Sequence, residues 1–454
     1  MFKKIELWIF ILVALILIVF SFFFGALVRQ ELEGSTKFGL ISRSALEISR
    51  IPARLKWIFS SKNTNPQYLE ETYEKKIVLS EKKLLSDDLY LLSRYSNKYR
   101  QGIVELRRLK DLELIHTYIP NQENFFLELK DKENFQVIKN NSLNKRFQID
   151  SPILNSDGSI TAVSANSLFT IDLCNNLKIL NLDKHSHQSL NIDSNGNFVF
   201  PMKIEGRNKY SNYFDIDENF ENNGIGIFSK SGEMIFSKSI SEILIDNGYI
   251  GFLLGINRKL YDDPIHLNDV EPAKFDSNFF KKDDLFLSLR HRSAIIHYRP
   301  KTNKIIEIIM GPFSHQHDVD ILDDKTLSFF NNNSINELVV SPTIPVGEKL
   351  VGYNEILKYD LENKKFIKFI SSIMESKNVS TPTQGLVEIK KKYVLVEEHD
   401  NGNIYLFSPK NEIFWQFKNI DENKKFRVNW GRVESDENKI NEILEIISLN
   451  KCLN

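Results

Sequence analysis

The sequence predicts an all-β fold, a six-bladed β-propeller, with an N-terminal transmembrane helix and short flanking helices. Two observations indicate the propeller. From about residue 87 to residue 433, short apolar or alternating runs are separated by turn signals such as Asp157-Gly158 and Asn195-Gly196. Within this region a unit of four short strands recurs, which is typical of propeller blades. The 454 residues, 42% of them hydrophobic, are sufficient for one large core.

Charge and cysteine content exclude some classes of protein. The 59 basic and 60 acidic residues give a net charge of −1, so no nucleic-acid partner is expected. Cys174 and Cys452 supply neither a disulfide framework nor zinc-ligand spacing. They could pair in an oxidising compartment. We do not expect this pairing, because Cys174 lies in a strand-like run and Cys452 lies near the terminus.

Residues 1–30 are predicted to form a membrane anchor. Leu7 to Val28 is an apolar run without a charge, and its length matches the hydrocarbon core of a bilayer. Lys3 and Lys4 precede the run and favour a cytoplasmic N-terminus. The run is long for a cleavable signal, so an uncleaved anchor is the favoured interpretation. In either case the following chain is exported, which in a Gram-negative cell means the periplasm.

Residues 31–86 are predicted to form a juxtamembrane helical linker. Apolar residues recur there at helical spacing: Ile41, Ala45, Ile48, Ile51 and Leu55. Basic residues lie between them, so an amphipathic helix on the bilayer surface is the alternative to a simple linker helix. Pro52 is expected to break or kink this helix.

Residues 87–433 are predicted to form the propeller and residues 434–454 a helical tail. The six units begin near Leu89, Ser151, His187, His266, His317 and Gln384. The first unit lacks an opening strand. The segment 429–433, which follows the last unit, is expected to supply it and so to join the first and last blades.

Cationic side chains are predicted to meet at one mouth of the central channel. In a propeller the first strand of each blade lines the channel, and three of the expected first strands begin with His187, His266 and His317. Arg290 is expected in the second strand of the His266 blade, where it would share a face with Arg292. Several titratable groups in one cleft indicate a functional site, and a guanidinium suits a tetrahedral oxyanion.

The sequence resembles the bacterial arylsulfotransferases that work without PAPS. The resemblance is strongest in "DPIHLNDVEP", "LSLRHRSAIIHYRP" and "GPFSHQHDVDILDDKTLSFFNNN", between Asp263 and Asn333. "HSHQS" and the closing "NWGRV" are also similar to family motifs, and the coverage is roughly residues 90 to 433. The family's acid after the nucleophile strand is absent, since the chain has Phe330-Asn331-Asn332-Asn333 there. A membrane segment and short helices replace the extra N-terminal β domain of better-known members.

The resemblance implies roles for individual residues. His317 matches the histidine that is transiently sulfurylated, while His187, His266 and Arg290 match the residues that hold the sulfuryl group. The predicted substrate-binding residues are His185, His315, Arg292 and Asn268. His315 lies two residues before His317, and His185 two before His187, so the assignment within each pair stays open. An aryl sulfate donor and a hydroxyl acceptor are implied, with no metal and no cofactor.

Two other functions remain as alternatives. A non-catalytic propeller could bind a sulfated or acidic ligand, or scaffold an envelope complex, since fold does not imply function. A quinone dehydrogenase would want acidic metal ligands and a recurring tryptophan motif, and the four tryptophans form none. The natural substrates and the oligomeric state do not follow from the sequence.

Overall fold

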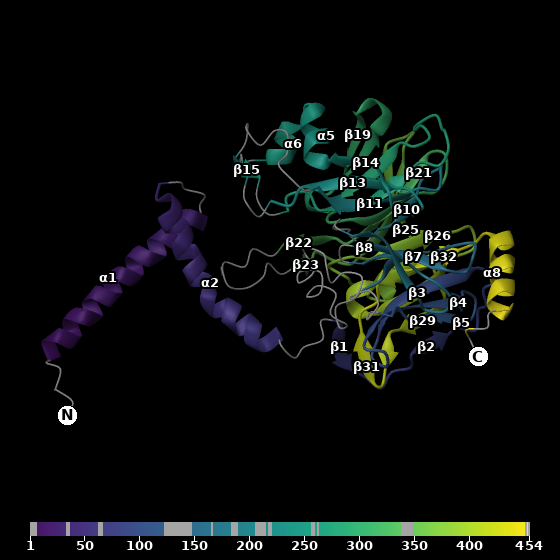
Figure 1. The fold of residues 1–454 in the computed structure, drawn as a ribbon, viewed down its shortest axis with the longest axis horizontal. Coiled ribbons are helices and arrows are strands. Elements are labelled where there is room, and N and C mark those ends of the chain that lie inside the picture. The colour runs from purple at the N-terminus through teal and green to yellow at the C-terminus, as the bar shows by residue number, and fades with distance from the viewer. Residues whose placement is uncertain are drawn as a thin grey trace. The chain divides into compact units, whose positions relative to one another are not determined.

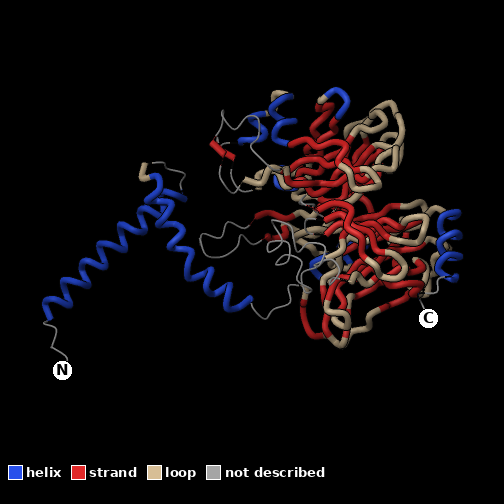
Figure 2. The backbone as a smooth tube through the Cα atoms, in the orientation of Figure 1, coloured by secondary structure: helices blue, strands red, loops and turns tan. Residues whose placement is uncertain are grey.

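The computed structural model describes residues 7–32, 37–61, 67–121, 148–164, 167–182, 189–204, 215–216, 220–255, 259–260, 263–336, 348–449 and 452. The chain divides into two compact units. One comprises Met1–Thr64 with Asn336–Glu348, and the other Asn65–Ile335 with Lys349–Asn454. The first contains two long helices, whereas strands dominate the second (Figures 1 and 2).

The smaller unit consists of α1 (Leu7–Leu32) and α2 (Gly39–Ser61). The span Leu7–Glu31 is long and apolar enough to cross a membrane, a property that an N-terminal signal sequence shares. Ser42 Oγ on α2 donates a hydrogen bond to Glu31 Oε2 on α1 at 2.7 Å. α2 continues through Pro52, so the proline does not break the helix. A proline removes one hydrogen bond and can bend a helix without ending it.

The larger unit is built from small antiparallel sheets. Among the described residues, six sheets have four or five strands. In spatial order the first is β32 (Arg432–Glu434), β3 (Leu89–Ser96), β4 (Gln101–Arg108) and β5 (Leu114–Tyr118). The second is β6 (Asp150–Leu154), β7 (Ile160–Ser164), β8 (Ser167–Ile171) and β9 (Leu177–Leu182). The third is β10 (Asn191–Ile192), β11 (Phe198–Lys203), β13 (Asn223–Phe228) and β14 (Met234–Ser239).

The remaining three sheets follow in the same way. The fourth is β16 (Leu267–Pro272), β17 (Leu285–Leu289), β18 (Ala294–Arg299) and β19 (Lys304–Met310). The fifth is β20 (His317–Ile321), β21 (Thr326–Asn331), β24 (Glu355–Asp360) and β25 (Lys365–Phe369). The sixth is β26 (Leu386–Ile389), β27 (Val394–Glu398), β28 (Asn403–Ser408), β29 (Glu412–Lys418) and β2 (Ile77–Leu79).

Short elements connect these sheets. The smaller sheets are β1 (Tyr68–Glu71) with β31 (Lys424–Phe426) and β30 (Ile420–Asp421), β12 (Asp215–Ile216) with β15 (Lys259–Leu260), and β22 (Ser334–Asn336) with β23 (Glu348–Leu350). The helices are α5 (Ile240–Asp246), α6 (Ile250–Leu254), α7 (Ser371–Ser376) and α8 (Glu437–Leu449), with 3₁₀ turns η1 (Arg290–Arg292), η2 (Pro300–Thr302) and η3 (His399–Asn401). The strands β1 and β2 lie in the segment expected to be helical.

Apolar clusters lie between successive sheets, and one of them joins the sixth sheet to the first. Side chains alternate between the two faces of a strand, so Leu89 and Leu91 of β3 pack toward the second sheet while Tyr90 and Leu92 pack toward the sixth. In β21, Phe329 packs toward the fourth sheet and Phe330 toward the sixth. Further clusters join the second to the third sheet and the third to the fourth. Each sheet therefore packs against the next, and the sixth packs against the first.

The end of the chain completes the first sheet, as the sequence predicted. β32 pairs antiparallel with β3, placing Val433 opposite Tyr90. α8 then buries Ile440, Ile443 and Ile447 in the cluster between the first and second sheets. The predicted amphipathic tail helix is thereby confirmed.

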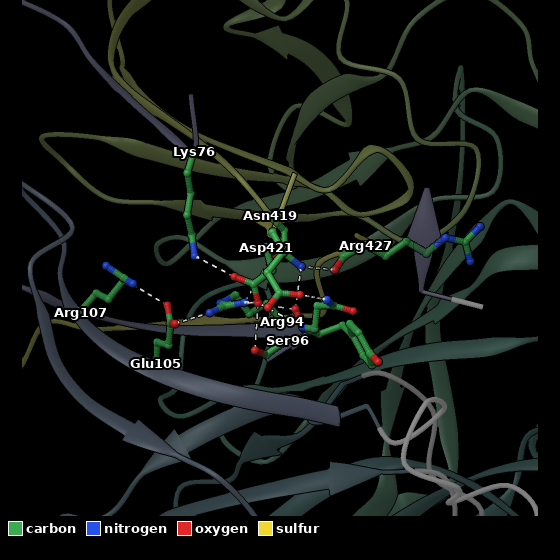
Figure 3. Close-up of polar contacts among 11 residues, drawn as sticks. Lys76, Arg94, Ser96, Glu105, Arg107, Asn419, Asp421 and Arg427 are labelled. Atoms are coloured by element: carbon green, nitrogen blue, oxygen red, sulfur yellow. Dashed lines mark hydrogen bonds and ion pairs between the residues drawn. The ribbon is translucent and has the colours of Figure 1, made fainter. Parts of the chain in front are cut away.

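Buried charges reinforce this seam between the beginning and the end of the chain (Figure 3). Arg94 of β3 donates to Glu105 of β4 at 2.5 Å and to Asp421 of β30 at 3.1 Å. Arg107 donates to the other Glu105 oxygen at 2.7 Å. Asn419 also accepts from Arg94 and donates to backbone carbonyls on both sides of the seam. Several partners share each buried charge, which limits the cost of removing it from water.

The two cysteines form a disulfide, contrary to our expectation. Cys174 lies in an exposed turn between β8 and β9 rather than in a strand, and Cys452 follows α8. Their Cα atoms are 5.3 Å apart, a separation that suits a disulfide. The helix α8 returns the terminus to the second sheet, a tertiary effect that sequence spacing does not reveal. Structural disulfides are typical of oxidising compartments.

Candidate active site

The starts of β16 and β20 and the end of β17 meet at one place. The register opposes Leu267 to Leu289, so His266, just before β16, lies beside η1, just after β17. The backbone N–H of Arg290 donates to the His266 carbonyl at 3.0 Å. His315 is on the other side, with its ring centroid 5.7 Å from that of His291. His317 is the first residue of β20.

Hydrogen bonds fix the tautomer of His317. Its Nδ1 lies 2.7 Å from Asn332 Oδ1 and 3.1 Å from the His315 carbonyl oxygen. The Asn332 amide nitrogen donates to the carbonyls of Thr381 and Gln384, so its oxygen must face His317. Both described partners of Nδ1 are acceptors, so Nδ1 carries the proton. Nε2 is then left with the lone pair of a nucleophile.

Burial keeps the two histidines before and within β20 uncharged. His317 is 1% exposed. Burial lowers the pKa of His317 well below its ordinary value, and the positive charges of Arg290 and His266 lower it further. Burial, then Arg290 and the neighbouring histidines, lowers the pKa of His315 to about 3. Both imidazoles are neutral at physiological pH.

The segment that carries Arg290 differs from the prediction. Arg290–Arg292 forms the 3₁₀ turn η1, which ends at Ser293 with a left-handed φ of 47°. The expected alternation of a strand therefore fails here. Arg292 points to α6, where it donates to the Leu253 carbonyl. His291, which lies between the two arginines in the sequence, joins the site.

Arg290 and His291 form a charge-assisted pair. His291 Nδ1 lies 2.6 Å from the Asp263 carbonyl oxygen, to which it can only donate. Its Nε2 is then an acceptor and receives a hydrogen bond from Arg290 Nη1 at 2.7 Å. His291 is therefore neutral. Its hydrogen bond with the guanidinium orients the side chain of Arg290, which is 3% exposed.

His266 is held by Asp263. The carboxylate accepts from the His266 backbone N–H at 2.8 Å and contacts the Nδ1 atom of the ring. The residue has a left-handed φ of 51°, a conformation unusual for a non-glycine residue and often found at functional sites. Burial would raise the pKa of Asp263, but the hydrogen bond from the His266 side chain and the charge of His266 lower it well below its usual range.

The other predicted residues are placed as follows. His315 Nδ1 lies 3.2 Å from Ser334 Oγ. Asn268 donates to the Gln316 carbonyl at 2.8 Å, and its Oδ1 is buried without a hydrogen-bond partner among the described residues. His185 and His187 lie outside the described residues. The sequence analysis missed Asp263, His291 and Asn332. A polar asparagine directly after an apolar strand was the signal for Asn332.

Asp263, His266 and His291 are the one described group close enough to share a metal ion, with potential ligand atoms within 4.8 Å. Both ring nitrogens of His291 and the Nδ1 atom of His266 already have hydrogen-bond partners. His291 Nδ1 donates to a carbonyl, and its Nε2 faces the Arg290 guanidinium. A cation at this position would be repelled by Arg290. The arrangement suits an anion instead, and we assign no metal to it.

Acidic residues lie beyond His317 on the inner strands. A cavity of about 20 Å³ is lined by Asp269, Asp318, Asp320 and Glu388, together with Trp430 and Arg432. Burial raises the pKa of Asp269 to about 6, and burial and the neighbouring acids raise the pKa of Asp318 well above its ordinary value. Among the described residues, the histidines and Arg290 of the candidate site lie in the segments preceding β16 and β20, at the start of β20 and in η1, whereas Arg432 lies at the acidic cavity.

Comparison with known families identifies the chain. A model of the arylsulfotransferase (ASST) family matches residues 163–420, more than half of the 454 residues. The chain belongs to the arylsulfotransferase family. The matched region contains all the described residues of this arylsulfotransferase site, from Asp263 to Asn332.

Solved structures resemble the arylsulfotransferase chain only distantly. A Bacteroides caccae protein of unknown function has 10% identity and a TM-score of 0.46, covering 76% of this chain and 98% of the other. A streptogramin B lyase has 11% identity and a TM-score of 0.38, covering 80% and 99%. An inactive virginiamycin B lyase from Staphylococcus aureus with quinupristin has 13% identity and a TM-score of 0.37, covering 79% and 99%. No curated protein sequence matches.

Proposed function

We propose that the protein transfers a sulfuryl group from an aryl sulfate ester to a phenolic or other hydroxyl acceptor through a sulfohistidine at His317. The observation that carries the proposal is the tautomer of His317. A neutral imidazole with Nδ1–H bonded to Asn332 presents an Nε2 lone pair. Arg290 and His266 are near enough to His317 to lower its pKa, and His291 and His315 pack beside them, a group of cationic and imidazole side chains that suits an anionic substrate.

The first half-reaction breaks the ester. The Nε2 lone pair forms a bond to sulfur as the bond from sulfur to the aryl oxygen breaks, and the electron pair leaves with the phenolate. Arg290 stabilises the charge on the peripheral oxygens, as guanidinium groups do in phosphoryl transfer. His266 donates a proton to the departing phenolate. His317 then carries the sulfuryl group on Nε2 and retains its proton on Nδ1.

The second half-reaction reverses these roles. An acceptor hydroxyl attacks sulfur, the bond from Nε2 to sulfur breaks, and His317 regains its lone pair. His266 now accepts the hydroxyl proton, which restores its charged form. His187 belongs to the proposed sulfuryl-binding set on the strength of the family motif. His315 packs beside His291, while Asn268 and Arg292 act indirectly, Asn268 by holding the Gln316 carbonyl between His315 and His317 and Arg292 by tying η1 to α6.

We further propose that the six packed sheets are the blades of one propeller with the site at the mouth of its channel. The cyclic order of the apolar clusters supports this architecture. The proposed location is extracytoplasmic, in a periplasm, with α1 as a single-pass anchor. The length and apolarity of α1 and the disulfide support that location.

The test uses the full chain in detergent with a chromogenic aryl sulfate and a phenol acceptor, without PAPS. We expect acceptor-dependent phenolate release with ping-pong kinetics. The variant His317→Asn should abolish release and the mass increase of one SO₃ group on the protein. The control His297→Asn removes an equally buried histidine from the fourth sheet, bonded to Asp284, and should retain transfer.

Two outcomes would contradict the proposal in different ways. Release that survives in His317→Asn would move the nucleophile, with His315 the next candidate. A folded wild-type protein that releases no phenolate from several donors would favour the non-catalytic propeller that binds a sulfated or acidic ligand.

A further inference from the structure

Asp263 contacts two histidines of the site with two different groups. Its carboxylate contacts Nδ1 and the backbone N–H of His266, while its backbone carbonyl accepts from His291 Nδ1 at 2.6 Å. The rings of His266 and His291 lie 4.6 Å apart. One residue thus determines the orientation of both imidazoles.

These contacts place the two histidines in different protonation states. A carboxylate beside Nδ1 stabilises a positive charge on the His266 ring. The carbonyl oxygen beside His291 Nδ1 is neutral, so it does not stabilise a positive charge on that ring. The Arg290 guanidinium, which donates to Nε2, disfavours such a charge. Environments that separate the charges of neighbouring titratable groups are how active sites assign acid and base roles.

A second residue fixes Asp263 itself. Asn223, 3% exposed, donates from its amide nitrogen to Asp263 Oδ1 at 2.9 Å. Its amide oxygen accepts from the Leu267 backbone at 3.1 Å, which sets the direction of the amide. The carboxylate is therefore anchored to β13 of the third sheet and to the start of β16. It can hold the His266 ring in one direction.

We propose that Asp263 is a positioning residue that keeps His266 protonated and aimed as the proton donor to the departing phenolate. This role rests on the proposed sulfuryl transfer. Neither the sequence motifs nor the family assigned a function to Asp263. His266 becomes the acid of the first half-reaction and, once deprotonated, the base of the second. His291 stays neutral and serves Arg290.

The fourth sheet contains a second aspartate–histidine pair, which differs from Asp263 and His266 in its exposure. Asp284 also bonds a histidine, His297, at 2.8 Å, but those side chains are only 1% and 2% exposed. The side chains of Asp263 and His266 are 19% and 21% exposed, so a substrate can reach the ring. The pair of Asp284 and His297 is buried, whereas the pair of Asp263 and His266 at the candidate site is partly exposed.

The charged and titratable groups around His266 all bear on its protonation. Within the described part of the chain they are Asp263, Arg290, His291, His315 and His317. The positive charge of Arg290 disfavours a charge on His266. His315 and His317 are buried and neutral. Asp263 supplies the negative charge of this group. Its removal should therefore change the charge of His266 more than the removal of any other group in this described set.

The experiment compares wild type, Asp263→Asn and the control Asp284→Asn as full chains. Transfer is measured from a nitrophenyl sulfate and from an unsubstituted phenyl sulfate between about pH 5 and pH 9. Phenolates of weakly acidic phenols need the proton most. We expect Asp263→Asn to reduce kcat on the order of 100-fold for phenyl sulfate and less than about tenfold for the nitrophenyl ester. The alkaline limb should move down by about 1 pH unit.

A second readout does not depend on turnover. The imidazole resonances of the nine histidines are followed by NMR against pH, with His266 assigned from His266→Gln. Asp263→Asn should lower the titration midpoint of His266, while Asp284→Asn should leave it unchanged. If Asp263→Asn does not fold, Asp263→Glu keeps the charge and should preserve the leaving-group pattern with a smaller loss in kcat.

The outcomes separate this role from the proposed function. Wild-type transfer with an unchanged His266 midpoint and an equal loss for both donors in Asp263→Asn would overturn the positioning role alone. Absence of transfer in wild type, with a His317→Asn variant that behaves identically, would overturn the proposed function. Asp284→Asn should reproduce neither kinetic change.

Discussion

The Nδ1 atom of His317 donates a hydrogen bond to the Oδ1 atom of Asn332 over 2.7 Å. The acceptor is neutral, whereas histidines that act as bases are often paired with a carboxylate. In a sulfohistidine the ring is positively charged while Nδ1 keeps its proton. A neutral partner orients this ring without stabilising the charge strongly. The intermediate therefore remains a good sulfuryl donor.

Replacing Asn332 with alanine should slow both half-reactions. The ring loses the contact that fixes its tautomer, and partners of this kind typically affect activity 10- to 100-fold, so we expect a loss on the order of 10- to 100-fold in kcat/KM. Asn419→Ala removes another fully buried asparagine, at the seam, and should leave kcat/KM within about threefold while lowering stability. Steady-state kinetics with thermal melting measures both. Equal kinetic losses in the two variants would contradict the assigned contact.

The acid limb of phenolate release should lie far below the ordinary histidine range. Burial, then the charge of Arg290, lowers the pKa of His317 well below 6.5, so the nucleophile stays unprotonated as the solution becomes acidic. Single-turnover release from a nitrophenyl sulfate should therefore change little between about pH 7 and pH 5.5, since that donor needs little proton donation. Arg290→Gln removes a positive charge and should move the acid limb to higher pH.

Arg299→Gln is the control for this experiment. Arg299 is in the fourth sheet and pairs with Asp284 at 2.7 Å, and neither residue belongs to the candidate site. Its loss should leave the acid limb in place. A wild-type limb near pH 6.5 would mean that His317 is solvated during the reaction.

The sequence predicts strands better than it predicts the site. The apolar run of β3 follows from a local pattern, because a strand buried on both faces must present apolar residues in both directions. The start of β20 at His317 also follows from local sequence. Arg290 was placed in a strand that ends one residue earlier. Where β17 stops is decided by its register with β16 and by the left-handed Ser293, neither of which is a local signal.

The missed residues share one cause. Asn332 reaches His317 from the position directly after β21, and Asp263 acts on His291 through a backbone carbonyl. A carbonyl contact carries no signature in residue type. The disulfide was missed for a similar reason, since α8 brings Cys452 to Cys174 across 278 residues. Short-range sequence patterns therefore identify the cationic side chains. Their protonation states depend on hydrogen bonds to residues that only the tertiary structure brings close.

Acid should weaken the seam between the two ends of the chain. Burial would raise the pKa of Glu105, but Arg94 and Arg107 outweigh it and lower the value to about 2, from 4.5. A depressed carboxyl pKa contributes stability that is fully present above pH 4.5 and lost as pH falls through about 2. The contribution is roughly 3 kcal/mol. Urea unfolding between about pH 7 and pH 2 measures it.

Glu105→Gln should lower the free energy of unfolding by about 3–5 kcal/mol at neutral pH, because two buried guanidinium groups lose a charged partner. It should also flatten the acid dependence. The exposed pair of Lys325 and Glu362, 2.8 Å apart, provides the control. Glu362→Gln should change stability by less than about 1 kcal/mol. An unchanged acid dependence in Glu105→Gln would place the sensitivity in other groups.

The disulfide should stabilise the closure of the first sheet. β32 contributes a strand to that sheet from the C-terminal end of the chain, and the bond from Cys452 to Cys174 ties the end of α8 to the second sheet. Opening the bond frees a loop of 278 residues in the unfolded chain. Cys452→Ser should therefore lower the free energy of unfolding by about 2–5 kcal/mol under oxidising conditions. Cys174→Ser should match it, and the double variant should lose no more. Reductant should lower the melting temperature of wild type alone, and a wild type that is insensitive to reductant would show that the packing of Ile440, Ile443 and Ile447 is sufficient to hold the seam.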